Sequence, residues 1–167
     1  MDNVFLDKSI NERFLIYIWD NGCFSKDNLR AKDGRKIEII DKGKWNEESG
    51  ADFHSAEIRI NGILYKGDIE IHIRNSDWKV HHHDKDPRYN DTILHVALWD
   101  SGINLLTRKQ NGQRIPTLIL HNYLDRSINR LWKELELKNI VRTCNNILEP
   151  QALTNVLDKL GMDRFEE

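Results

Sequence analysis

The sequence predicts an α/β (α+β) fold in which helices flank a mixed central β-sheet. Three observations support this prediction. Apolar residues recur at helical spacing near residues 10–20, several later segments alternate between apolar and polar residues as strands do, and helical spacing returns from residue 124 onwards. A helix, several strands and then further helices are the order expected for helices packed around a mixed sheet.

Size and composition place the chain among globular proteins. Its 167 residues suffice for one domain with a hydrophobic core, and 39% hydrophobic with 31% charged residues excludes a disordered chain. The net charge of −2 gives no overall nucleic-acid signature, so any phosphate contact needs a local cluster of Lys and Arg. Cys23 and Cys144 form no CxxC pair, which excludes zinc–thiolate and redox motifs. Without a membrane-length apolar run or a signal peptide, we expect a cytoplasmic protein with no membrane contact.

The helix predicted over residues 10–20 has a signal at each end. Ser9 and Glu12 form a capping-box pattern, and Gly22 supplies a stop. The strands that follow are bounded by Asp-Gly and Asn-Gly turns, which favour tight connections. Strands are expected at residues 36–41, 55–61, 63–74, 92–99, 103–108 and 114–121, with a loop at 43–50.

The second half of the chain becomes helical. Asp86-Pro87 predicts a short helix or turn. The spacing from Leu124 predicts a long helix, and Pro150 and Gly161 bracket a last one. We therefore expect two parts, a core over residues 1–123 and a C-terminal helical segment over 124–167 that packs on that core.

A candidate site lies on the strand that contains Gly67–His72. Its isoleucines point to one face of the strand, while Glu70 and His72 point to the other. Asp52 stands at the start of the preceding strand. A lone carboxylate, a hairpin and then Glu-x-His is the layout of a metal site, although alternating polar residues more often mean only that one sheet face is wet.

Five of the seven histidines lie between residues 72 and 95. His81 and His83 share a face if their segment is extended, and imidazole suits zinc, manganese, nickel or iron. A run of three histidines can equally be a solvated loop. His95 lies in an apolar strand, where a histidine is more often part of the core than a ligand. Tyr89 and Asn90 either orient groups around the site or build the turn.

Four motifs resemble an uncharacterised bacterial family, domain of unknown function 2851. They are Gly50-Ala51-Asp52-Phe53, the segment 67–72, Ser76-Asp77-Trp78 and the segment 91–96. The resemblance covers about residues 10–121 and, more loosely, the rest of the chain. Members of that family are usually much longer, so we expect this chain to be a fragment or a shortened member.

The family's pattern is similar in turn to the PD-(D/E)xK nuclease superfamily, whose core is a helix, three antiparallel strands, a helix and a further strand. This resemblance implies a restriction-endonuclease-like core and phosphodiester hydrolysis of nucleic acid with Mg²⁺ or Mn²⁺. Asp52, Glu70 and the backbone carbonyl of Ile71 would hold the ion. His72 stands in place of the catalytic lysine, where it would accept the proton of the attacking water. Ala51 replaces the usual proline.

Two other functions stay open on the sequence. Glu70, His72, His81 and His83 would suit a transition metal such as zinc without phosphodiester chemistry, and a degenerate nuclease fold would serve as a binding module. Lys79, Lys85 and Arg88 would contact phosphates or are ordinary surface charges. Further candidates for contacts around the site or with a substrate are Trp78, Lys79, Tyr89, Asn90 and His95.

Overall fold

A computed structural model describes residues 10–102 and 106–145 of the chain. The chain divides into two compact units, with the boundary after Ile128. In chain order the elements are α1 (Glu12–Asn21), β1 (Ile37–Asp41), β2 (Lys44–Trp45), β3 (Phe53–Ile60), β4 (Ile63–Arg74), α2 (Asp77–Val80), η1 (Pro87–Tyr89), β5 (Thr92–Trp99), β6 (Thr117–Ile119), η2 (Leu120–Tyr123) and α3 (Ile128–Asn145).

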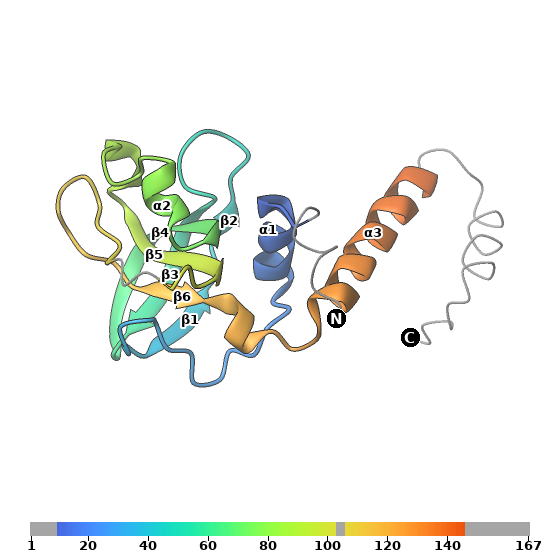
Figure 1. Ribbon diagram of the computed structural model, residues 1–167, viewed down its shortest axis with the longest axis horizontal. Helices are drawn as coiled ribbons and strands as arrows, with labels where there is room; N and C mark the ends of the chain where they lie inside the picture. Colours follow the sequence, from blue (N-terminus) through green and yellow to red (C-terminus); the bar gives the residue numbers. More distant parts are fainter. Residues whose placement is uncertain (1–9, 103–105, 146–167) are drawn as a thin grey trace. The chain divides into compact units, whose positions relative to one another are not determined.

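The first unit is built on one curled sheet, to which the described residues contribute six strands (Figure 1). Its strand order is β1-β3-β4-β5-β6, and β2 pairs with β3 off this path. The pairs β1–β3, β2–β3 and β3–β4 are antiparallel, whereas β4–β5 and β5–β6 are parallel. Helices α1 and α2 both pack against β4. The predicted mixed α+β architecture, with helices flanking a central sheet, is confirmed.

Helix α1 begins two residues later than predicted because its N-cap is Asn11, whose Oδ1 accepts a hydrogen bond of 3.1 Å from the Phe14 backbone N–H. Ser9, the predicted cap, lies outside the described residues. Gly22 ends the helix as predicted, with a φ of 63° in the left-handed region that glycine adopts without strain. The buried face of the helix consists of Phe14, Leu15, Ile18 and Trp19.

The strands at the centre of the sheet follow the sequence closely. Strands β3 and β4 form the predicted hairpin, and its turn residues Asn61 and Gly62 have φ values of 50° and 85°, as a type I′ turn requires. Strand β5 covers the predicted range Thr92–Trp99, and η1 begins at Pro87 as the Asp-Pro pair predicts. Local signals are therefore sufficient for the central strands.

Predictions for the peripheral strands are wrong in part. The predicted loop at 43–50 contains the short strand β2. Of the predicted strand at 114–121, only Thr117–Ile119 is extended, and η2 follows it directly. Residues 106–108 contribute a single bridge between Arg108 and Arg114, while 103–105 lie outside the described residues.

The second unit contains most of α3. This helix begins at Ile128, later than the helical spacing from Leu124 suggests. Side chains one turn apart interact on its surface, as in the hydrogen bond of 2.9 Å from Trp132 Nε1 to Glu136 Oε1. The helix predicted between residues 150 and 161 lies outside the described residues. The packing of this segment on the core stays a prediction.

Gly67 fixes how closely β4 approaches the segment before β5. A Cβ atom at this position would lie 2.3 Å from the Asp91 carbonyl oxygen. That same carbonyl accepts a hydrogen bond of 2.9 Å from the Asp68 backbone N–H. The pairing continues into a parallel register in which Glu70 lies opposite His95. A side chain larger than hydrogen would therefore disturb the strand pairing that places the polar residues of both strands.

We expect Gly67→Ala to destabilise the protein by about 1–3 kcal/mol, because its methyl group would overlap backbone as well as the Ile93 side chain. Gly34→Ala is the control, since a Cβ there meets nothing within 4 Å and only the φ of 86° opposes it. Urea denaturation monitored by circular dichroism measures both. Equal losses of stability in the two variants would contradict a close contact at Gly67.

Candidate metal centre

The middle of the polar face of β4 is buried rather than wet, whereas Arg74 at its end is exposed. Glu70 and His72 are 6% and 1% exposed, because the segment between β4 and β5 folds back over them through α2. Trp78 of α2 stands edge-on to His72, with ring centroids 6.5 Å apart. Its Nε1 donates a hydrogen bond of 2.8 Å to the Arg108 carbonyl, which fixes the indole over the strand. The alternation on β4 therefore marks an interior polar cluster.

Asp52 and Glu70 are joined through the backbone by two hydrogen bonds. The backbone N–H of Asp52 donates to Glu70 Oε2 over 3.1 Å, and the backbone N–H of Ile71 donates to Asp52 Oδ2 over 2.8 Å. Each carboxylate therefore accepts a hydrogen bond from the backbone of the segment that carries the other carboxylate. The two acidic groups predicted as ligands lie side by side, at the start of β3 and in β4 respectively.

Burial raises the pKa of both carboxyl groups. It raises the pKa of Asp52 to about 7, and the negative charge of Glu70 adds to this shift. Burial likewise raises the pKa of Glu70 to about 8, although the hydrogen bond from the Asp52 backbone acts in the opposite direction. Two neighbouring carboxylates with raised pKa values favour a bound cation, whose charge would stabilise both ionised forms.

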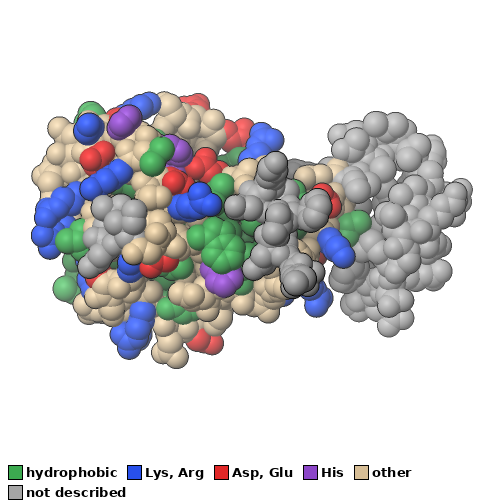
Figure 2. All heavy atoms as spheres, viewed as in Figure 1, with side chains coloured by type: hydrophobic (Ala, Val, Ile, Leu, Met, Phe, Trp, Pro, Cys, Tyr) green, Lys and Arg blue, Asp and Glu red, His purple; other side chains and the backbone are tan. Residues whose placement is uncertain are grey.

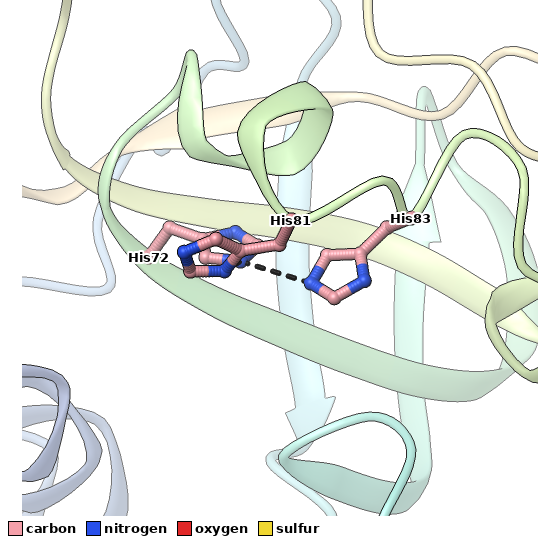
Figure 3. A group of neighbouring side chains, drawn as sticks. All are labelled: His72, His81 and His83. Carbon is pink, nitrogen blue, oxygen red and sulfur yellow. Dashed lines mark hydrogen bonds between the residues drawn. The ribbon is translucent and has the colours of Figure 1, made fainter.

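Four histidines gather next to this pair, and Figure 3 shows three of them with their rings turned toward one another. His72 lies at the centre: its Nε2 is 3.1 Å from His81 Nδ1 and 3.2 Å from His83 Nε2. His83 Nε2 is also 3.2 Å from Glu70 Oε1, and His72 Nε2 lies 3.5 Å from the same oxygen. The histidine cluster therefore contacts the carboxylate pair through Glu70.

Behind His72 a chain of buried polar groups runs into the sheet. His72 Nδ1 lies 3.0 Å from His95 Nε2 on β5. His95 Nδ1 is 3.3 Å from the Thr107 hydroxyl and 3.4 Å from that of Thr117, and the two hydroxyls are 2.6 Å apart. Each ring nitrogen of His95 therefore faces a polar partner. His95 is both a core histidine and a neighbour of the cluster.

Three histidines of the cluster, His72, His83 and His95, are held in their neutral form. Burial lowers the pKa of His72 far below its usual value, and the neighbouring imidazoles lower it further. Burial also lowers the pKa of His95 to about 3 and that of His83 below its usual range. A ring that resists protonation is a poor proton acceptor but a good metal ligand, because neutral imidazole offers a lone pair.

The other predicted site residues divide into two groups. Tyr89 lies against His83 with ring centroids 3.8 Å apart and an angle of 34° between the rings. Trp78 packs against the same ring at 5.4 Å, so both residues orient the cluster. Asn90 instead builds the turn, where its carbonyl accepts a hydrogen bond from Lys109 Nζ. The basic candidates Lys79, Lys85 and Arg88 are all exposed. Arg88 forms an ion pair with Asp86.

Three residues near the site were missed by sequence reasoning. Glu12, at the start of α1, interacts electrostatically with Asp52 and Glu70, and partial burial raises its own pKa. Thr107 and Thr117 contact His95. Glu12 looked like an ordinary capping residue, and no spacing connects the two threonines to His95. Only the tertiary fold brings them together.

Comparison with known proteins places the chain in a family. The family model described as "Protein of unknown function (DUF2851)" matches residues 12–167. The chain belongs to this family. It matches none of the curated proteins and none of the solved structures. Among the described residues of this DUF2851 member, no helix combines the length and the apolar character needed to cross a bilayer.

The raised carboxyl pKa values predict a pH dependence for the metal-free protein. From about pH 5 up to about pH 8 the folded chain binds protons at Asp52 and Glu70 that the unfolded chain has already lost. Raising the pH therefore lowers the free energy of unfolding, by roughly 1–2 kcal/mol between pH 7 and 9. His72, His83 and His95 contribute little to this window, because their lowered pKa values keep them neutral in the folded chain.

Urea titrations in the presence of a chelator, repeated across this pH range, measure the dependence. Glu70→Gln should flatten it. Glu57→Gln is the control, since Glu57 lies outside the site and pairs with Lys66. A slope in Glu70→Gln as steep as that of the unchanged chain would contradict the raised pKa of Glu70.

Proposed function

We propose that this DUF2851 member is a metal-dependent nuclease of the PD-(D/E)xK type. The observation that carries the proposal is the pair of Asp52, which is half-buried, and Glu70, which is buried. Reciprocal hydrogen bonds hold each carboxylate to the other residue's strand. Each carboxylate keeps one oxygen, Asp52 Oδ1 and Glu70 Oε1, that these backbone bonds do not use. Carboxylate oxygens are the ligands that Mg²⁺ and Mn²⁺ prefer.

The order of elements gives independent support. Helix α1 precedes three strands, β1, β3 and β4, which pair antiparallel, and the short helix α2 leads to β5, parallel to β4. This is the order given above for the restriction-endonuclease-like core. In that arrangement the first acidic ligand starts the middle strand and the second lies in the next one, where Asp52 and Glu70 stand.

In this proposal the ion would activate a water molecule and neutralise charge on a phosphate oxygen. Asp52, Glu70 and the Ile71 carbonyl are the groups proposed to hold it. His72 is less suited to accept the water's proton than the sequence suggested, because burial lowers its pKa.

The proposed substrate is nucleic acid, bound locally rather than through a broad basic surface. On the face seen in Figure 2, Lys and Arg side chains are interspersed with Asp and Glu. Lys79 and Lys85 lie exposed in the segment that covers the site, where they would reach backbone phosphates. Few phosphate contacts imply that binding weakens only moderately with salt.

We expect the purified protein to cleave single- or double-stranded DNA or RNA when Mg²⁺ or Mn²⁺ is present. Asp52→Asn and Glu70→Gln should reduce cleavage to the level seen with a chelator, because each removes one anionic ligand. Glu57→Gln should cleave normally. Gel assays with labelled substrates measure cleavage, and circular dichroism verifies folding. Full cleavage by folded Asp52→Asn would refute the proposal.

A further inference from the structure

We propose that His72, His81 and His83 form a transition-metal site, in which His72 Nε2, His81 Nδ1 and His83 Nε2 bind one ion of the zinc class. The site goes beyond the nuclease proposal, which rests on the carboxylates. It would bind its ion whether or not the chain cleaves nucleic acid.

The spacing of the three nitrogens supports a common ion. They all lie within 4.8 Å of one another, and His72 Nε2 is 3.1 Å and 3.2 Å from its two neighbours. Tetrahedral ligands at about 2.0–2.1 Å from zinc are separated by about 3.4 Å. The rings therefore stand close to the required spacing, and small side-chain rotations would centre them on one ion.

The groups around the three rings match the demands of a cation. Each nitrogen of a neutral imidazole is either a hydrogen-bond donor or an acceptor, so three ring nitrogens that face one another cannot all be satisfied by hydrogen bonds among themselves. One cation, in contrast, can accept the lone pairs of all three nitrogens. Glu70 Oε1, 3.2 Å from His83 Nε2, places a negative charge at the edge of the site.

The buried chain behind His72 is an independent observation that points the same way. A metal bound at Nε2 requires the proton of His72 on Nδ1, which faces His95 Nε2 at 3.0 Å. His95 must then carry its own proton on Nδ1, toward the hydroxyls of Thr107 and Thr117. Both ring N–H groups in this chain then meet an acceptor. Such partners commonly orient metal-bound histidines and raise their basicity.

The exposure of the ligands indicates an accessible site. His72 and His83 are 1% and 7% exposed, while His81 lies at the surface. Three protein ligands on one ion leave a fourth position, which in zinc enzymes belongs to water or substrate. The ligand class expected at that position is water or a small anion. A site built only for structure would have four protein ligands.

The test uses the full chain, treated with a chelator and then titrated with Zn²⁺ or Co²⁺. We expect one ion per chain by calorimetry, with visible Co²⁺ absorption of a four- or five-coordinate nitrogen site. His81→Asn should weaken binding at least about tenfold, a loss typical of a damaged metal shell. His82→Asn is the matched control: His82 is exposed, and asparagine accepts its φ of 61°. It should bind within about twofold of the unchanged chain.

Two further variants separate this site from the nuclease proposal and from a purely structural role. Asp52→Asn should abolish cleavage yet keep the Co²⁺ spectrum. His95→Leu should weaken Co²⁺ binding and shift the spectrum, while His95→Gln, which retains an acceptor for His72, should restore most of the affinity.

Equal effects of His81→Asn and His82→Asn would overturn the site. So would failure of the folded chain to bind Zn²⁺, or loss of the Co²⁺ spectrum in Asp52→Asn but not in His81→Asn. In the last case the ion belongs to the carboxylates.

Discussion

The burial of the polar face of β4 is the constraint on which the rest of this structure depends. Glu70 and His72 leave water when the segment between β4 and β5 closes over them, and buried polar groups are destabilising unless partnered. The chain supplies the partners from distant positions: the Asp52 backbone, the ring of His83 and the ring of His95. The fold and the candidate site are therefore one arrangement, since the contacts that stabilise the closed segment are the contacts that bring the candidate ligands together.

Much of the fold is encoded locally, while the site is only partly so. The Asn-Gly turn and the alternation on either side of it suffice for the hairpin, and the apolar run Thr92–Trp99 suffices for β5. The strand predicted over 114–121 is shorter because Pro116 has no N–H to donate to the sheet, so regular pairing begins at Thr117. The wrong cap of α1 has a similar origin, because Ser9 and Asn11 are both good capping residues and the sequence does not rank them.

For the site, alternation placed Glu70 and His72 on one face, and the hairpin placed Asp52 near them. The sequence could not show that this face is interior, because the covering depends on Trp78 reaching the Arg108 carbonyl. Nor could it separate His81 and His83, which join the cluster, from His82, which the left-handed backbone at that residue turns away. Three identical residues in a row acquire different roles only through backbone geometry.

The hydrogen bond from Trp78 to the Arg108 carbonyl has a consequence for dynamics. It connects the segment that covers the site to the stretch of chain before β6, and Thr107, next to Arg108, contacts His95. The same indole packs on His72 and His83, so this bond and that packing would be lost together when the segment opens. The covering segment should therefore open as one cooperative unit rather than fray residue by residue. Access to the interior would then be set by the free energy of that local opening, with the sheet beneath remaining intact.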